Sequence, residues 1–210
     1  LLGEHVTISQ EKGDWLKIES PEQTKFSPDA RRWRRKTGWI KKNQAIPVAA
    51  FPINNLIVKK QKANIFTQNK TIPVSIGTKL LAIGRETGFY HVQLPNGSIG
   101  RIEESSIRFL NNNLYFSENE IFCLRKKLAE TAKTFLDSPY LWGGRSCPNL
   151  QLESQQTGVD CSGFINLVYR VNGLQIPRDA HDQFLFCEEI QRKQLLLGDL
   201  IFFENTNTKK

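Results

Sequence analysis

The chain has 210 residues, of which 39% are hydrophobic and 24% are charged, and its formal net charge is +8. This composition is typical of a folded globular protein and excludes a wholly disordered chain. No apolar run approaches the roughly 20 residues of a membrane-spanning helix. The positive charge is concentrated in the first 110 residues, so the two halves should carry different functions.

Two stretches of the front half share a pattern of short strands. GDWLKI at 13–18 is followed by TGWI at 37–40, and GFYHV at 88–92 is followed by IGRI at 99–102. Short strands at close spacing, separated by turns, are typical of small β-barrels. The pattern resembles bacterial Src-homology-3-like domains, twice over. It predicts a first all-β barrel at 1–50, with its start missing, and a second at 51–112.

Turn-forming residues divide this front half further. Asn96-Gly97 predicts a tight hairpin, because Asn-Gly supplies the positive φ angles that such a turn needs. Residues 72–83 should add another alternating strand around Gly77. Residues 47–55, which contain two prolines, should form the linker between the barrels.

The densest basic run lies in the first of these units, at residues 31–36, with Trp33 inside it. One interpretation is a solvated loop of a basic protein. The other is a surface for an anionic polymer, either nucleic acid or cell-wall glycan. The residues of the run are Arg31, Arg32, Arg34, Arg35 and Lys36.

The back half has a helical pattern. A capping box at 117–120 begins an amphipathic helix that should end near Asp137. A second helix should begin at Cys161 or just before it, and Gly173 should end it. Residues 195–203 predict an apolar strand interrupted by a Gly-Asp pair. Helices followed by a strand predict an α+β domain at 113–210.

The four cysteines include no Cys-x-x-Cys pair, so we expect neither a zinc site nor a disulfide framework. Cys161 differs from the others because it stands at a predicted helix start. Unpaired N–H groups and the helix dipole favour the thiolate there, and the same N–H groups could stabilise an oxyanion. The alternative is a buried thiol acting as a small hydrophobe, which is the default for Cys123 and Cys187.

Three sequence blocks indicate the chemistry: PYLWGG at 139–144, DCSGF at 160–164 and GDLIFF at 198–203. Together they resemble the NlpC-type peptidases, a papain-like family of cysteine hydrolases acting on bacterial peptidoglycan peptides. The resemblance implies a papain-like α+β peptidase domain at 113–210, with its last strands missing. It implies hydrolysis of the amide between D-glutamate and a diamino acid, with no metal or organic cofactor.

The resemblance also implies partners and a location. The partner would be peptidoglycan or a muropeptide rather than nucleic acid, and the protein would act as a monomer. It would work in the bacterial cell envelope, either the periplasm or the wall, with the cytoplasm as the alternative. The net charge alone leaves open a nucleic-acid-binding barrel protein that uses residues 31–36.

Carried over by position, the resemblance makes Cys161 the nucleophile. Asp160 and Tyr140 would bind the free amine of an N-terminal L-alanine, although Asp160 also suits a helix N-cap. Glu4 could be a carboxylate that the first barrel lends to the site. The remaining candidate substrate-binding residues line the pocket: Ser162, Trp142 and His181.

The catalytic histidine of the family follows the GDLIFF block, and this sequence has no histidine after His181. We therefore expect the complete protein to continue with a strand bearing that histidine within about 15 residues of Lys210. His181 could instead be the base, a pocket residue or a plain surface residue. The alternative function is a non-catalytic wall-binding protein with a degenerate peptidase domain.

Overall fold

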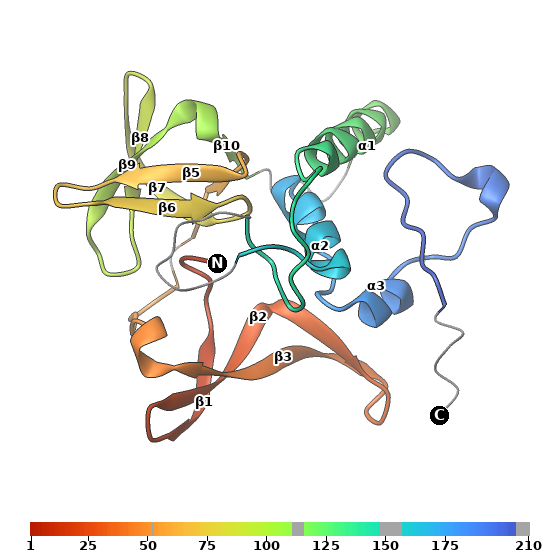
Figure 1. Ribbon diagram of the computed structural model, residues 1–210, viewed down its shortest axis with the longest axis horizontal. Helices are drawn as coiled ribbons and strands as arrows, with labels where there is room; N and C mark the ends of the chain where they lie inside the picture. The colour runs from red at the N-terminus through yellow and green to blue at the C-terminus, as the bar shows by residue number, and fades with distance from the viewer. Residues whose placement is uncertain (52, 111–115, 148–156, 205–210) are drawn as a thin grey trace.

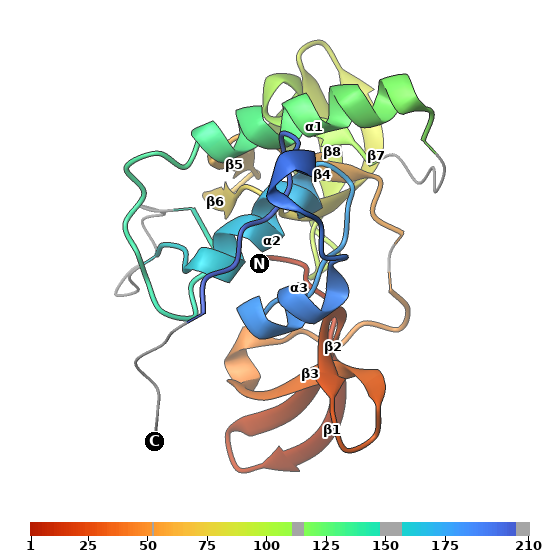
Figure 2. The same ribbon diagram turned by 90° about the vertical axis from the view of Figure 1, so that its right-hand side faces the viewer.

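The computed structural model describes residues 1–51, 53–110, 116–147 and 157–204. In these ranges, two antiparallel sheets come first and three α-helices follow them. Figure 1 shows the first sheet below, the second at the upper left and the helices on the right, and Figure 2 shows α3 lying next to the first sheet. The order of elements, β first and α after, agrees with the prediction from sequence.

The first sheet has the order β1-β2-β3, and a short 3-10 helix, η1 (Lys42–Gln44), follows it. Alternation along β2 buries Leu16 and Ser20 and exposes Trp15. The solvated loop, one of the two interpretations of the basic run, is wrong for most of it, because the run extends from the β2–β3 turn into β3 and pairs there with β2. A closed barrel stays a prediction. The strands are β1 (Thr7–Lys12), β2 (Trp15–Ser27) and β3 (Arg32–Lys41).

The second sheet has the order β10-β4-β7-β8-β9-β5-β6 and contains a core of buried aliphatic residues. The predicted Asn-Gly hairpin is confirmed, because Gly97 has φ +81° between β8 and β9. A 3-10 turn, η2 (Glu104–Ser106), precedes β10. The strands are β4 (Leu56–Val58), β5 (Lys62–Phe66), β6 (Thr71–Ser75), β7 (Lys79–Glu86), β8 (Phe89–Gln93), β9 (Ile99–Glu103) and β10 (Ile107–Phe109).

The prediction of one strand over 72–83 is wrong. The chain turns at Gly77, which has φ +83°, and this turn divides the segment into β6 and β7. A Cβ at Gly77 would lie 2.8 Å from Cδ2 of Leu167, which belongs to α2. The turn therefore needs glycine both for its backbone conformation and for the close approach of a helix.

The helices are α1 (Glu118–Lys133), α2 (Cys161–Val171) and α3 (Ala180–Phe186). The capping box before α1 is confirmed, since Ser117 Oγ accepts from the Glu120 N–H and Glu120 Oε2 accepts from the Ser117 N–H. The predicted start of the second helix at Cys161 is also confirmed. No helix in the described ranges has the length and apolar character needed to cross a membrane.

The apolar strand predicted at 195–203 is not formed. A strand needs a hydrogen-bonded partner, and among the described strand pairings none involves this segment. A 3-10 turn, η3 (Arg192–Gln194), precedes a turn at Leu197-Gly198, which the Asp199 N–H closes by donating to the Leu196 carbonyl. Arg125 of α1 binds Asp199 Oδ1 at 2.6 Å, and the Tyr169 hydroxyl donates to the Gly198 carbonyl at 2.6 Å. The segment is therefore fixed to the helices by side chains.

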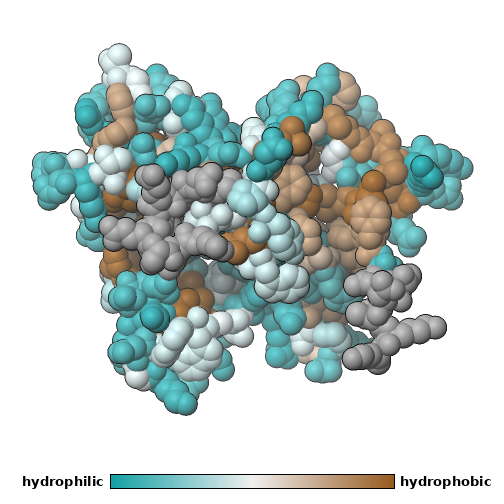
Figure 3. All heavy atoms as spheres, in the orientation of Figure 1, coloured by the Kyte–Doolittle hydropathy of each residue, from teal (hydrophilic) through white to brown (hydrophobic). Residues whose placement is uncertain are grey.

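Apolar side chains gather on the face formed by the helices and the C-terminal segment, seen as brown and tan spheres on the right of Figure 3. They come from the end of α3 and from the segment that was predicted as a strand. The most exposed are Phe184, Phe186, Leu196, Leu197, Ile201 and Phe203. This face differs in character from the basic first sheet.

One cluster of charges joins all three parts of the fold. Glu22 of β2 pairs with Arg170 of α2 at 2.7 Å and with Lys79 of β7 at 2.6 Å. Arg170 Nε also donates to the carbonyl of Gly77 at 2.7 Å. The first sheet, the β6–β7 turn and α2 therefore meet at a single carboxylate.

Candidate active site

The site is built at the start of α2. Asp160 is the N-cap, and its Oδ1 accepts the Gly163 N–H at 2.6 Å. Cys161 is the first helical residue and is exposed. The first N–H groups of a helix have no intrahelical partner, and they lie at its positive end. The Cys161 thiol is therefore accessible and lies beside donors that can stabilise negative charge.

The Asp160 carboxylate is held on both oxygens. Arg178 binds it in a bidentate way, with Nη1 to Oδ1 at 3.0 Å and Nη2 to Oδ2 at 2.8 Å. The Gly143 N–H donates to Oδ2 at 3.0 Å. Burial would raise the pKa of Asp160, but the hydrogen bonds from Arg178 and from the Gly163 N–H outweigh burial and lower this pKa. The carboxylate is therefore ionised and paired at neutral pH.

Glycines allow the two motif segments to touch. A Cβ at Gly163 would lie 2.3 Å from the Gly144 carbonyl oxygen, and a Cβ at Gly144 would lie 2.5 Å from the Gly158 carbonyl oxygen. The Asp160 N–H also donates to the Gly144 carbonyl at 3.1 Å. The WGG and DCSG sequences thus place residues 140–144 directly against the first turn of α2, where larger side chains would not fit.

Two buried amides hold the segment that carries Arg178. Asn166 of α2 donates to the Ile176 carbonyl at 2.9 Å. Gln183 of α3 donates to the Pro177 carbonyl and to the Ser162 carbonyl, both at 3.0 Å. Both side chains are almost fully buried. They fix the loop before α3, so that the guanidinium meets Asp160.

The structure brings some of the predicted site residues together. Ser162 is buried, and its Oγ lies 3.1 Å from Arg178 Nη1 and 3.3 Å from Asp160 Oδ1. Tyr140 forms a backbone bridge with Val159, next to Asp160, and its side chain is 63% exposed. Trp142 is 86% exposed on the same segment. The backbone of this segment therefore lies next to the N-terminus of α2, and the roles of these side chains stay predictions.

His181 lies in the first turn of α3 and is exposed. In the described part of the chain, none of the contacts of Cys161 or Asp160 involves it. His5 stacks on Phe51 with ring centres 4.6 Å apart, and His91 lies 3.4 Å from Glu86 in the second sheet. The described geometry therefore gives none of these histidines a contact with the thiol.

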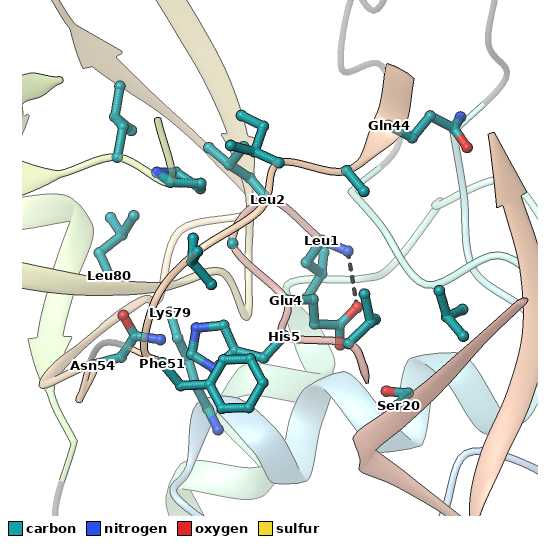
Figure 4. A pocket seen from close by; sticks show the side chains of 18 of the residues that line it. Leu1, Leu2, Glu4, His5, Ser20, Gln44, Phe51, Asn54, Lys79 and Leu80 are labelled. Carbon is teal, nitrogen blue, oxygen red and sulfur yellow. Dashed lines mark hydrogen bonds and ion pairs between the residues drawn. The ribbon is translucent and has the colours of Figure 1, made fainter. Parts of the chain in front are cut away.

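Glu4 lies at the edge of a cavity of about 530 Å³ between the first sheet, the linker and the second sheet. Figure 4 shows Glu4 pointing toward Leu1, and His5 lying against Phe51. Glu4 pairs with Arg145, which donates to Asn166 of α2 at 3.0 Å. Burial would raise the pKa of Glu4, whereas the charge and the hydrogen bond of Arg145 act to lower it. A role for Glu4 toward substrate stays a prediction.

The other cysteines have different surroundings. Burial raises the pKa of the Cys147 thiol to about 11. Burial, and then the charge of Asp199, raise the pKa of Cys187. Cys123 and Cys187 are both exposed residues, so the expectation of buried thiols at these two positions is wrong. Across the described ranges, no three His, Cys, Asp or Glu side chains gather as they would around a metal ion.

Sequence reasoning missed the residues that support the site. The sequence analysis singled out none of the four: Arg178, Asn166, Gln183 and Arg145. The signal available for Arg178 was only its residue type, because arginine binds carboxylates in a bidentate way. The two amides gave no such signal, since their partners are backbone carbonyls in another segment.

Known proteins are similar to this chain at two levels, over its last third and over its whole length. Residues 137–210 match the NlpC/P60 family. Two curated relatives are each named gamma-D-glutamyl-L-lysine dipeptidyl-peptidase. The Bacillus cereus relative is 31% identical over 100% of this chain and 60% of its own length. The Bacillus subtilis relative is 30% identical over 97% of this chain and 62% of its own length. This chain thus spans about three fifths of each.

A solved structure is similar over the whole of this chain. It is a crystal structure of an NlpC/P60 family protein from Bacillus cereus, with a TM-score of 0.81 and 30% sequence identity. The match covers 100% of this chain and 66% of that chain. The similarity therefore includes both sheets as well as the helices.

Proposed function

We propose that this chain, whose residues 137–210 belong to the NlpC/P60 family, is part of a cysteine peptidase that hydrolyses γ-D-glutamyl–diamino acid bonds in peptidoglycan peptides. The observation that carries the proposal is the exposed Cys161 thiol at the first position of α2, next to a paired Asp160. The names of the two Bacillus relatives support γ-D-glutamyl-L-lysine as the bond and release of a dipeptide as the outcome.

The proposed mechanism begins with attack of the Cys161 thiolate on the amide carbonyl. The first-turn N–H groups of α2 stabilise the oxyanion of the tetrahedral intermediate. The amine leaves, a thioester to Cys161 forms, and water then hydrolyses it. A base must take the thiol proton and return it to the leaving amine. The resemblance assigns that base to a histidine after the GDLIFF block, and we retain this assignment.

We further propose three units, at 1–50, 51–112 and 113–210. The three-stranded sheet, the seven-stranded sheet and the helices lie within these ranges, which supports the division. Two Src-homology-3-like barrels and a papain-like domain are the fold that this division suggests. The substrate class favours action in the bacterial envelope, and the cytoplasm is the alternative location. We propose that the protein acts as a monomer.

Substitution of the thiol tests the function. In the gene product that contains this chain, Cys161→Ala should abolish release of L-Ala-D-Glu from L-Ala-γ-D-Glu-L-Lys, because the attacking atom is lost. Cys123→Ala, which removes another exposed thiol, should retain activity. Dipeptide release is followed by chromatography. If Cys161→Ala retains turnover, the assignment of the nucleophile is wrong. If the native protein binds the peptide without cleaving it, the non-catalytic alternative holds.

We also propose that Asp160 and Tyr140 contribute to recognition of a free N-terminal amine. A dipeptidyl-peptidase must sense the amino end of its substrate, which supports the proposal, while the bidentate Arg178 supports the capping role of Asp160. Acetylation of the L-alanine amine should lower kcat/KM by about 30-fold or more, because a neutral amide lacks the charge and the donors with which an ammonium binds these side chains. Asp160→Asn should discriminate far less between the two peptides. Equal cleavage of both by the native protein would refute amine recognition.

A further inference from the structure

Arg145 lies directly after the glycines of the WGG sequence and is held on several sides. Its backbone forms a bridge with Val159, the residue before Asp160. Its guanidinium donates from Nη1 to Asn166 Oδ1 at 3.0 Å and forms an ion pair with Glu4 through Nη2. Only 8% of its side chain is exposed. Arg145 therefore connects the segment before the nucleophile, the middle of α2 and the segment before β1.

Arg145 carries its charge in unfavourable surroundings. Burial lowers the pKa of Arg145, against the charge and the hydrogen bond of Glu4, which act to raise it. The charges of Arg170 and Arg178 add to the lowering. A buried guanidinium is stable only where its charge and its donors have partners, and Glu4 and Asn166 are such partners. The need for solubility, which explains many exposed arginines, does not explain this one.

The contact with Arg145 fixes the orientation of the Asn166 side chain. An arginine has only donors, so the amide oxygen of Asn166 must face it and the amide nitrogen must face the other way. That nitrogen donates to the carbonyls of Ile176, at 2.9 Å, and Pro177, at 3.4 Å. With the amide reversed, its oxygen would meet two carbonyl oxygens, which would lose their donor. Arg145 therefore decides whether Asn166 can hold the loop before Arg178.

The loop held by Asn166 leads to the charge that neutralises Asp160. Arg178 follows the loop directly, and both of its terminal nitrogens donate to the Asp160 carboxylate. Asp160 in turn caps α2 through the Gly163 N–H. A continuous series of polar contacts therefore leads from Arg145 through Asn166 and Arg178 to the first turn of α2.

We propose that Arg145 is a positioning residue for the proposed hydrolysis. By orienting the Asn166 amide, it holds Arg178 on Asp160. The first turn of α2, and with it Cys161, then keeps the geometry needed for attack. This role rests on the proposed function for the identity of the reaction. Because Arg145 acts through other side chains, its loss should slow the chemical step more than it weakens substrate binding.

The test uses two variants of the gene product that contains this chain, with L-Ala-γ-D-Glu-L-Lys as substrate. Arg145→Gln introduces an amide, which can present its own oxygen to Asn166 and no longer fixes its orientation. Asn166→Asp keeps an acceptor for Arg145, but its carboxylate has no donor for the loop. Each variant should lower kcat by about tenfold or more and change KM by less than about threefold. Retention of kcat by both, or a loss through KM alone, contradicts the proposal.

A double variant tests whether the two residues act in one series. If Arg145 acts through Asn166, adding Arg145→Gln to Asn166→Asp should lower kcat no further than the larger single loss. Independent effects would multiply to about a hundredfold, and the proposal would then be wrong. Arg145→Lys keeps a group that can only donate, so it should retain kcat within about threefold. It decides the matter if the other variants fail to fold by circular dichroism, and a loss of tenfold in it counts against the proposal.

A matched control is Arg170, another buried arginine next to the candidate site. Its side chain is 9% exposed, pairs with Glu22 at 2.7 Å and donates to the Gly77 carbonyl at 2.7 Å. Arg170→Gln therefore makes the same change at similar burial, but its contacts lead to the two sheets. We expect it to lower the melting temperature while leaving kcat of the folded protein within about threefold. An equal loss of kcat in this control would overturn the role given to Arg145.

A second readout does not depend on hydrolysis. Iodoacetamide labels the Cys161 thiol at pH 7, and mass spectrometry of the peptide that contains it gives the rate. If Arg178 leaves Asp160, the free carboxylate opposes the thiolate, so Arg145→Gln should slow labelling by about threefold or more. Slower labelling in a protein whose native form cleaves no peptide would refute the proposed function and keep the positioning role. Unchanged labelling in a protein whose native form does cleave the peptide would refute the positioning role alone.

Discussion

At the scale of single residues, the pairing of Asp160 with Arg178 resolves a conflict at the candidate site. A free carboxylate next to a nucleophilic thiol would oppose the thiolate through like-charge repulsion. Here the carboxylate is neutralised by a bidentate guanidinium, and it caps α2 through the Gly163 N–H. One aspartate can thus fix the start of the helix without a net negative charge beside Cys161.

Removal of Arg178 should destabilise the protein and change its response to acid. Both side chains of the pair are almost buried, so Arg178→Gln should lower the free energy of unfolding by about 3 kcal/mol. The folded-state pKa of Asp160 lies below its usual value. Its contribution to stability is therefore complete above a pH of about 4 and is lost as pH falls through the folded pKa.

Urea unfolding at pH 7 and at pH 3 measures both effects. The destabilisation caused by Arg178→Gln should shrink at the lower pH, because the wild type has begun to lose the same interaction. Arg85→Gln is the control, since its ion pair with Glu104 is exposed and should contribute little. A destabilisation by Arg178→Gln that is the same at both pH values would contradict the role given to the ion pair.

At the scale of elements, the position of α2 depends on glycines that allow backbone contact. Gly163 lies in the first turn of the helix, against the carbonyl of Gly144. An alanine inside a helix normally gains up to about 1 kcal/mol over glycine. At this position the backbone oxygen is only 2.3 Å from the new Cβ, so steric overlap dominates over propensity. The glycine of the DCSG motif is therefore explained by backbone packing, in addition to the chemistry of the neighbouring Cys161.

Gly163→Ala should accordingly destabilise the protein by about 2 kcal/mol or more, as overpacking against backbone does. Gly38→Ala in β3 is the matched control, because a Cβ there meets nothing within 4 Å and its φ is not positive. The control should be neutral or slightly stabilising. Thermal unfolding of both variants measures the difference. Equal melting temperatures would mean that the segment from 140 to 144 moves away without cost.

The elements whose signals are local could be predicted from the sequence. The capping box at Ser117 and the Asn-Gly turn at Gly97 depend on neighbouring residues, and both were read correctly. The strand expected at 195–203 failed because strands depend on a partner elsewhere. The contacts of the site, such as Arg178 to Asp160 or Gln183 to the Ser162 carbonyl, depend on tertiary packing. Sequence periodicity carries no information on such pairs.

At the scale of the whole molecule, the first sheet is joined to the helices by side chains that are far apart in the sequence. Asp182 of α3 accepts the Phe26 N–H at 3.1 Å, and Trp33 meets Phe186 with ring centres 5.8 Å apart. Glu22 adds ion pairs with Arg170 and Lys79, and we call this set of contacts the joint. These contacts involve the same helices that form the candidate site, so the first sheet should affect the site's stability.

Glu22 offers a direct test of that joint. Burial would raise its pKa, but the charges and hydrogen bonds of Arg170 and Lys79 lower it. Glu22→Gln should therefore weaken the joint by about 1–3 kcal/mol, because Arg170 stays buried and loses its carboxylate. Released from the helices, the first sheet should expose the linker at 47–55, whose described residues form no helix or strand. Limited proteolysis should then cut the linker at least about fivefold faster.

The control is Glu11→Gln, which breaks an exposed pair between β1 and Lys42 of η1 and should leave the cleavage rate unchanged. Wild-type protein should also become more sensitive to an acid-active protease as pH falls below the usual carboxyl range, since protonation of Glu22 removes the same charge. The Glu22→Gln variant should show a smaller increase over that range. If Glu22→Gln and Glu11→Gln are cut at the same rate, the first sheet is held by its contacts with α3 alone, and the shared carboxylate does not control the joint.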